Sequence, residues 1–415
     1  MKRYLIIQLA RFGDLIQTKR LVKSLVNREG SEVHLCVDHS LATLASIVYP
    51  ETKVHSIAAH GKEKSSHASM DVLLENISSF QALREQNFSE VFNLNFSPIN
   101  FRVAALFSDL PVHGYFWKNG QEQIGTWPAM AMRWSRYRRL GINLMDFWAG
   151  YCPDMISPAQ VNPQATPKGG GIGVVLSGRE SRRSLPVETL SRIVTTKASS
   201  LKTPAIRLLG SKAEVDAGKK VVKSLPRHLQ DKAVNLAGKT NWKELVEVVA
   251  DLDLLITPDT GTMHLAAHLG TPTLAFFLSS AWCFETGPYG LGHTVFQADT
   301  SCLPCLESEP CPYDVKCLDC FNKPEFHRFL VTQKGTHAPD NLLTFISNFD
   351  ELGLVFESTS GEDSHAEDRK IFRSIIHQFL TGQNVHASEL ETPFIRKLYQ
   401  DKDWSTLVPF GTIME

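Results

Sequence analysis

The sequence predicts an α/β protein made of two similar halves, each built on a parallel β-sheet. Three observations predict this class. Short apolar runs that look like buried strands alternate with segments of helical periodicity, a Pro-, Gly- and polar-rich stretch at 157–171 interrupts this alternation, and the alternation then resumes. Strands that alternate with helices form βαβ units and parallel sheets. The chain has 415 residues, which is enough for two such domains.

The first half is expected to form one domain over residues 1–160. Its apolar runs predict strands at 4–9, 32–38, 54–57 and 91–95. Its helical patterns begin near Asp14 and continue at 41–48 and 70–86.

The second half is expected to form a domain over residues 170–320. Its predicted strands are 171–177, 205–210, 233–238, 252–257, 273–277 and 294–298, and helices fill at least three of the gaps. Two facing Rossmann-like domains of this kind make the GT-B architecture. Because open parallel sheets bind ligands beyond the carboxyl ends of their strands, we expect the ligand in a cleft between the halves. The same architecture also hosts epimerases, so the fold alone does not fix the function.

Residues 321–415 are expected to form a mostly helical C-terminal extension. A polar stretch at 357–370 is typical of a loop, and helical amphipathicity returns at 371–380.

Composition narrows the function classes. The chain carries 43 Lys and Arg against 44 Asp and Glu, and this balance argues against nucleic acid as the main partner. The first apolar run stops at Arg11, which is too early for a signal peptide, and the most apolar region (251–284) is too interrupted for a membrane span. We therefore expect a cytoplasmic protein, in which the eight cysteines are thiols or metal ligands rather than disulfides.

The segment PDTGTMHLAAH joins a predicted buried strand to a helix that starts near Gly261. Thr260 suits an N-cap, and the free N–H groups of a helix start form an anion site. Asp259 beside it is well placed to accept hydrogen bonds from sugar hydroxyls, although it could merely cap the helix. His264 and His268 share a helix face, but no Glu follows His264 as in a zincin, which favours a packed or ligand-facing pair over a metal site.

Two further strand ends carry charged residues. Asp14 follows the first strand in QLARFGDLIQT, where a carboxylate could remove a proton from an attacking hydroxyl or could simply start the helix. The loop LSGRESRRSLP (176–186) follows the first strand of the second half. Arginine-rich loops grip diphosphates through bidentate contacts. The alternative is a solvated charged loop, but the position at a strand end favours function.

These segments, in this order, resemble glycosyltransferase family 9, the ADP-heptose:lipopolysaccharide heptosyltransferases. The resemblance covers roughly residues 1–320. It rests on Gly13-Asp14 at the first helix, on the basic loop from Ser177 to Pro186, on NLAGKTNWKEL (235–245), and on Asp-Thr-Gly-x-x-His at 259–264.

The resemblance implies a role for each matched position. Asp14 is the expected general base, with Gly13 beside it at the acceptor. Arg183, with Arg182 and Ser177, is expected to hold the donor diphosphate, while Asp259 binds the heptose hydroxyls. Asn235 is expected at the ribose, where this chain departs from family members that often make the contact with an acidic residue. The other expected donor contacts are Gly238, Lys239 and Thr240 at the adenine, and Thr260, Gly261 and His264 at the helix start.

The acceptor side is expected to be basic. The segment MRWSRYRRLG (132–141) has interleaved arginines and aromatics. Arg133 and Arg136 could meet the anionic groups of a lipopolysaccharide core, or the segment could make peripheral contact with the inner membrane. A solvated helix face is the alternative.

The cysteine-rich loop at 302–320 contains two C-x-x-C pairs, and Cys302, Cys305, Cys317 and Cys320 could hold a structural Zn or Fe. Cys311 is then a spare thiol or a ligand in another pairing. The chemistry itself needs no cofactor, because Arg side chains and a helix start can offset the charge of the leaving group.

The predicted function is therefore transfer of heptose from ADP-heptose, or of another sugar from its nucleotide, to a lipopolysaccharide inner-core sugar with inversion. The alternatives are a protein (autotransporter) heptosyltransferase, in a group where cysteine-held iron is found, and a non-catalytic nucleotide-sugar-binding protein.

Overall fold

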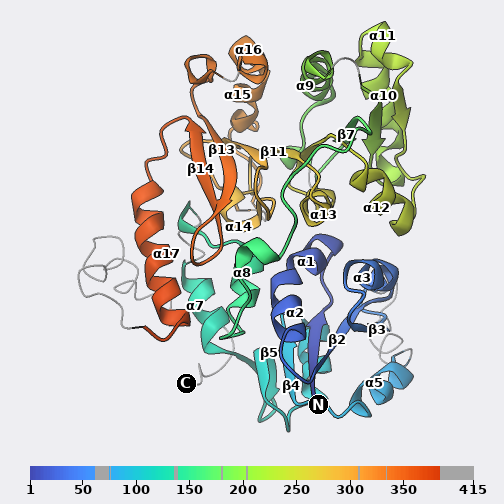
Figure 1. The fold of residues 1–415 in the computed structure, drawn as a ribbon, viewed down its shortest axis with the longest axis vertical. Coiled ribbons are helices and arrows are strands. Elements are labelled where there is room, and N and C mark those ends of the chain that lie inside the picture. The colour runs from blue at the N-terminus through green and yellow to red at the C-terminus, as the bar shows by residue number, and fades with distance from the viewer. Residues whose placement is uncertain are drawn as a thin grey trace. The chain divides into compact units, whose positions relative to one another are not determined.

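The computed structural model describes residues 1–60, 74, 76–134, 139–178, 181–201, 204–306, 309–332 and 334–383. The chain divides into two compact units (Figure 1). The first contains Met1–Tyr137, Leu144–Ile156 and Ile371–Glu415, and the second contains Arg138–Asn143 and Ser157–Lys370.

The first unit is built on a six-stranded sheet of order β3-β2-β1-β4-β5-β6. Pairing is parallel except between β5 and β6. The strands are β1 (Lys2–Gln8), β2 (Ser31–Asp38), β3 (Lys53–Ile57), β4 (Glu90–Asn93), β5 (Val112–Lys118) and β6 (Gln121–Ile124). Leu5, Ile6 and Ile7 of β1 are fully buried, as expected for a central parallel strand covered on both faces. The four strands predicted for this half are confirmed.

Helices of the first unit follow these strands. They are α1 (Phe12–Gln17), α2 (Lys19–Val26), α3 (Ala42–Val48), α5 (Ile77–Arg84), α6 (Pro98–Ala105), α7 (Thr126–Trp134) and α8 (Leu144–Ala149). A buried ion pair joins α2 to α8, with 2.6 Å between Arg20 Nη1 and Asp146 Oδ1. Of the helix predicted at 70–86, residues 70–73 and 75 lie outside the described residues.

The second unit is built on an eight-stranded sheet of order β14-β13-β12-β11-β10-β7-β8-β9. The parallel strands are β7 (Ile172–Val175), β8 (Ile206–Leu209), β9 (Ala233–Asn235), β10 (Leu254–Pro258), β11 (Thr273–Phe277) and β12 (Thr294–Ala298). All six coincide with predicted strands. The α/β prediction therefore holds in both units.

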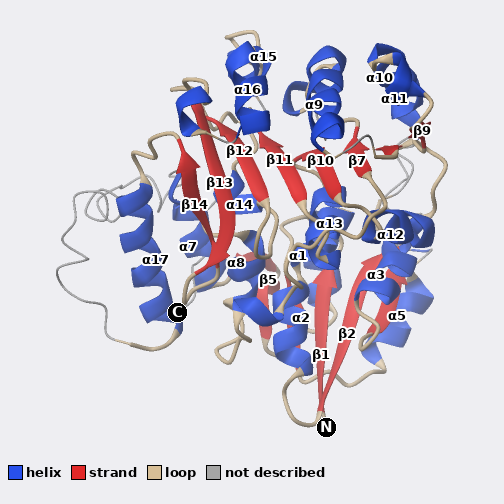
Figure 2. Ribbon diagram, turned by 45° about the horizontal axis from the view of Figure 1, so that its top comes forward, coloured by secondary structure: helices blue, strands red, loops and turns tan. Residues whose placement is uncertain are grey.

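Helices cover both faces of this second sheet. They are α9 (Val187–Ser200), α10 (Val215–Ser224), α11 (Arg227–Gln230), α12 (Trp242–Ala250), α13 (Gly261–Leu269), α14 (Cys283–Thr286), α15 (Asp319–Asn322) and α16 (Pro324–Thr332). Figure 2 shows α9, α10 and α16 on one face and α12 and α13 on the other. The chain thus winds outward from β7 in one direction and from β10 in the other.

The mostly helical extension expected over 321–415 contains two strands that the sequence analysis missed. β13 (Leu342–Phe349) pairs antiparallel with β12, and β14 (Leu354–Ser360) pairs antiparallel with β13. The polar residues that indicated a loop at 357–370 begin inside β14. An edge strand keeps one face in water and so tolerates polar residues. The helix expected at 371–380 is part of α17 (Ala366–Leu380).

In the first unit α17 packs on α7. The rings of Trp134 and Phe372 lie 5.3 Å apart, and those of Trp127 and Phe379 lie 6.3 Å apart. Residues 384–415 lie outside the described part of the chain. None of the helices that the structure describes is long and apolar enough to cross a bilayer.

Candidate functional site

The second sheet has a topological switch point between β7 and β10. These strands are neighbours, but the chain leaves β7 toward β8 and leaves β10 toward β11. The loops at the carboxyl ends of two such strands diverge and leave a crevice, which is where doubly wound sheets bind ligands. The basic loop follows β7, and Asp259 follows β10.

Arg183 and Asp259 form an ion pair at this switch point, between Arg183 Nη2 and Asp259 Oδ2. Both side chains are largely buried. The Thr286 hydroxyl also donates to Asp259 Oδ2, over 3.0 Å. Since buried pairs are screened by salt much less than exposed ones, this contact is a strong local electrostatic feature.

His264 lies beside the same carboxylate, with 3.8 Å between its Nε2 and Asp259 Oδ1. Burial and the positive charge of Arg183 lower the pKa of His264 to about 3. The imidazole is therefore neutral near pH 7.

Thr260, and not Asp259, caps α13. Thr260 has extended backbone, and its side chain accepts a hydrogen bond from Met263 N at 3.3 Å. This assigns the cap to the residue that the sequence favoured and removes capping as the explanation of Asp259. Gly261 opens the nine-residue helix, whose first N–H groups and dipole favour an anion.

The other basic-loop residues are held differently. Arg182 donates to the carbonyl oxygens of Glu309 (2.6 Å) and Leu306 (3.0 Å), so it ties the basic loop to the cysteine-rich loop. Ser177 is half-buried at the start of the basic loop. The loop closes on itself where Gly178 N donates to Ser184 Oγ over 2.8 Å.

Residues predicted near the nucleoside lie on the turn from β9 to α12. Asn235 donates to Val215 O (2.9 Å) and accepts from Ala237 N (3.1 Å), so its amide stabilises this turn. Gly238 has a φ of +67°, and a Cβ there would lie 2.8 Å from Cγ of Lys212. Lys239 and Thr240 complete the turn before α12. The turn is tightly built, which explains the glycine.

Asp14 lies in the first unit, at the carboxyl end of β1. This is also a switch point, since β2 and β4 flank β1. Gly13 and Asp14 lie within the first turn of α1, and Asp14 Oδ2 accepts a hydrogen bond from Arg11 N at 3.2 Å. Asp14 is thus the third residue of the helix and not its N-cap. It supports the helix start from inside, and it is half-buried.

Two residues of these edges went unnoticed in the sequence. Thr286, which binds Asp259, lies in α14, 27 residues further along the chain. Asn95 follows β4, and its side chain accepts from Leu9 N at 2.9 Å, next to the end of β1. A polar residue directly after a buried strand was the signal available for Asn95. No local signal marks Thr286.

The predicted acceptor arginines are only partly described. Arg133 belongs to α7 by its backbone, and Arg136 lies outside the described residues.

The cysteines are free thiols. Within the residues that the structure describes, no three His, Cys, Asp or Glu side chains are grouped so that they could hold a metal ion, and the predicted set of Cys302, Cys305, Cys317 and Cys320 is therefore not preformed. Burial raises the pKa of Cys317 to about 11, with smaller contributions from Cys305, Cys302 and Cys311. Burial likewise raises the pKa of Cys320 to about 12, and its thiol donates to Cys317 O. Cys311 thus interacts electrostatically with Cys317, as Cys302 and Cys305 also do.

Comparisons with known proteins agree with this geometry. The family described as Glycosyltransferase family 9 (heptosyltransferase) matches residues 196–314. A lipooligosaccharide heptosyltransferase 2 of Haemophilus influenzae is 38% identical over 73 residues, which are 18% of this chain and 21% of that protein. Lipopolysaccharide heptosyltransferase 2 of Escherichia coli is 34% identical over 70 residues, or 17% of this chain and 20% of that protein. These matches span about a fifth of the length of the curated relatives.

The fold has a solved counterpart. The structure of E. coli heptosyltransferase WaaC with ADP superposes with a TM-score of 0.53 at 15% identity, over 69% of this chain and 91% of that one. This likeness supports the expected GT-B fold. Together with the match at 196–314, which contains the Asp-Thr-Gly segment, it agrees with the resemblance drawn from the sequence. The match to glycosyltransferase family 9 thus lies within the second unit, over residues 196–314.

Proposed function

We propose that the protein is an inverting glycosyltransferase that moves heptose from ADP-heptose to an inner-core sugar of lipopolysaccharide. The observation that carries the proposal is the Arg183–Asp259 pair at the switch point of the second sheet. In this proposal the domain expected over 1–160 binds the acceptor and the domain expected over 170–320 binds the donor.

When the donor binds, two contacts with the ligand replace the Arg183–Asp259 contact. The diphosphate oxygens accept hydrogen bonds from the guanidinium of Arg183, and the sugar hydroxyls donate to the carboxylate of Asp259. The start of α13 adds N–H groups for the anion. Removing either buried partner alone would leave an uncompensated charge, so the donor, which supplies partners for both, fits the site electrostatically.

The reaction is a single displacement. Asp14 accepts the proton of an acceptor hydroxyl as that oxygen bonds to the anomeric carbon. The bond from this carbon to the diphosphate oxygen breaks at the same time, and the electron pair leaves with ADP. Arg183 and the helix start stabilise the departing charge.

Asp14→Asn tests the proposal, with Asp216→Asn as the matched control because Asp216 is an exposed carboxylate on α10. We expect turnover of ADP-heptose to collapse in Asp14→Asn, with ADP binding retained, and both to persist in the control. Full turnover in Asp14→Asn would show that Asp14 is not the general base. A thermal shift with uridine diphosphate sugars but not with ADP-sugars would contradict the donor.

For the cysteine-rich loop we propose a structural Zn or Fe. Thiolates are suitable ligands for either metal, and Cys302, Cys305, Cys311 and Cys317 interact electrostatically. The loop must rearrange to bind the ion. Metal content of chelator-free protein tests this: we expect one equivalent, lost in Cys305→Ser. No metal above trace level contradicts it.

We also propose that the protein works in the cytoplasm with peripheral contact at the inner membrane. The support is the basic segment 132–141. Flotation with anionic vesicles tests this proposal. Binding that is unchanged after Arg133→Gln and Arg136→Gln together would contradict it.

A further inference from the structure

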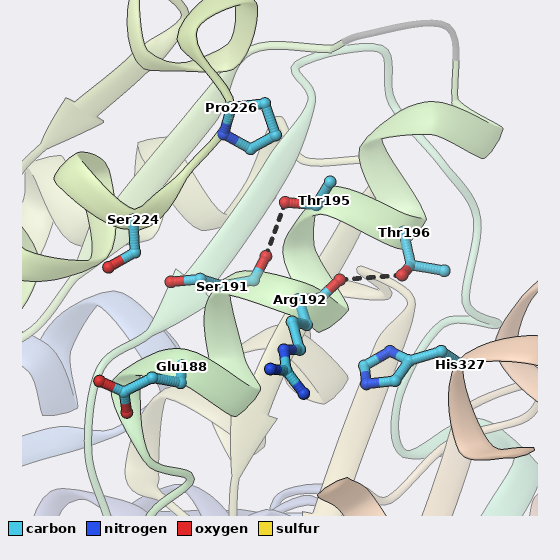
Figure 3. Close-up of a pocket in the computed structure, with 8 residues that line it drawn as sticks. All are labelled: Glu188, Ser191, Arg192, Thr195, Thr196, Ser224, Pro226 and His327. Carbon is cyan, nitrogen blue, oxygen red and sulfur yellow. Dashed lines mark hydrogen bonds between the residues drawn. The ribbon is translucent and has the colours of Figure 1, made fainter. Parts of the chain in front are cut away.

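A pocket lies on the face of the second sheet that α9 and α16 cover. It has a volume of about 460 Å³, within the range of small-molecule sites. Its walls come from α9, from the end of α10 with the following Pro226, and from α16, and Figure 3 shows the side chains. The lining residues are Glu188, Ser191, Arg192, Thr195, Thr196, Ser224, Pro226 and His327.

Hydrogen bonds near both ends of α9 tie it to α15 and α16. Near the start of α9, the Thr189 hydroxyl donates to Oδ1 of Asn322 at the end of α15. Near its other end, Lys197 Nζ donates to Leu330 O of α16 over 3.0 Å. Arg192 and His327 lie between these two ties. The pocket is therefore built into the packing of α9 against α16.

Two polar atoms of the pocket lack partners. Neither Ser191 Oγ nor His327 Nε2 has a hydrogen-bond partner among the described residues, and both atoms are shielded from water. Ser191 itself is only 4% exposed. Leaving such an atom unsatisfied is destabilising, and a ligand that reached it would supply the missing hydrogen bond.

The charges indicate which ligand fits. Arg192 and His327 extend into the same space from α9 and α16, while Glu188 lies at the other end (Figure 3). The positive charge of Arg192 contributes to the lowered pKa of His327, after burial, so the two groups interact. A guanidinium binds phosphate oxygens bidentately, and imidazole and hydroxyl groups can add further donors. A carboxylate at the far end instead accepts from hydroxyls.

We propose that this pocket binds a small phosphate monoester that carries hydroxyl groups, with the phosphate at Arg192 and His327 and a hydroxyl at Glu188. A sugar phosphate has this chemistry. The site is separate from the Arg183–Asp259 pair and does not depend on the activity proposed for that pair.

Calorimetric titration with glucose 6-phosphate, and with glucose at matched ionic strength, tests the proposal. We expect the phosphate to bind and glucose not to bind. Arg192→Gln and His327→Gln should each weaken the binding of glucose 6-phosphate by about tenfold or more, because each variant loses one charge-assisted hydrogen bond. Arg84→Gln, an exposed arginine of α5, is the charge-matched control and should change nothing.

A crossed pair of variants separates the two sites. Arg183→Gln should weaken ADP binding and leave the affinity for glucose 6-phosphate unchanged. Arg192→Gln should weaken glucose 6-phosphate binding and leave the affinity for ADP unchanged. Arg192 is exposed, so its variant should keep the wild-type unfolding midpoint. Wild-type affinity for glucose 6-phosphate in folded Arg192→Gln overturns the proposal, as does the absence of binding at millimolar probe. If Arg183→Gln loses glucose 6-phosphate binding while Arg192→Gln keeps it, the phosphate binds at the Arg183–Asp259 pair and the proposal is wrong.

Discussion

Arg183 and Asp259 are 76 residues apart in the chain and form a buried ion pair where β7 and β10 end. One side chain comes from each arm of the switch point. Burial lowers the pKa of His264 beside this pair, and the guanidinium of Arg183 lowers it further because it disfavours a second positive charge nearby.

The stability of this pair can be measured by a double-mutant cycle. Arg183→Gln leaves the buried Asp259 carboxylate without its charged partner, which should lower the free energy of unfolding by about 3–5 kcal/mol. Adding Asp259→Asn should recover part of this loss, because no buried charge then remains. Urea unfolding measures all three variants. Arg207→Gln is the matched control: its pair with Asp251 is more exposed, and the expected loss is below about 1 kcal/mol. Equal losses of unfolding free energy in Arg183→Gln and Arg207→Gln would contradict the prediction that the buried pair contributes more to stability than the exposed one.

Two substitutions at Asp14 separate its chemical and structural contributions. Asn keeps an oxygen that can accept from Arg11 N, so Asp14→Asn should preserve stability while turnover falls by about 10²–10⁴. Asp14→Ala loses the acceptor as well and should also destabilise α1. Turnover with purified acceptor and thermal unfolding together give both readouts. Parallel loss of stability and turnover in Asp14→Asn would indicate a structural role alone.

Stability should fall as the solution is acidified below about pH 6.5. Burial lowers the pKa of His55 to about 4 and that of His293 to about 4, and the pKa of His264 is about 3. Between pH 6.5 and about 4 the unfolded chain therefore binds protons that the folded chain does not, so unfolding becomes easier as pH falls. For the fully buried His264 and His293, each pKa unit of difference corresponds to about 1.4 kcal/mol, whereas the half-buried His55 contributes less because solvent screens it. Urea unfolding at a series of pH values measures the slope, and His293→Gln should reduce it. A slope of opposite sign would contradict this account.

The contact between α17 and α7 gives a prediction for the first unit. Phe372 is 1% exposed and packs on Trp134, so Phe372→Ala should cost about 3–5 kcal/mol. Phe379, about two turns further along, is 49% exposed, and Phe379→Ala should cost much less. Thermal unfolding of the two variants compares a buried and an exposed phenylalanine on the same helix. Similar midpoints would show that α17 does not stabilise this unit.

The sequence by itself determined the alternation of strands and helices, the parallel part of each sheet, and the strand ends at which Asp14, Arg183 and Asp259 lie. These features follow from local periodicity and from the residue types at each strand end. Only the tertiary structure decided that Arg183 meets Asp259 while Arg182 turns to the cysteine-rich loop, that Thr286 joins the pair, and that β13 and β14 extend the second sheet. Those outcomes depend on which strands become neighbours. A polar edge strand such as β14 carries almost no local signal, because its pairing partner is fixed by the rest of the sheet.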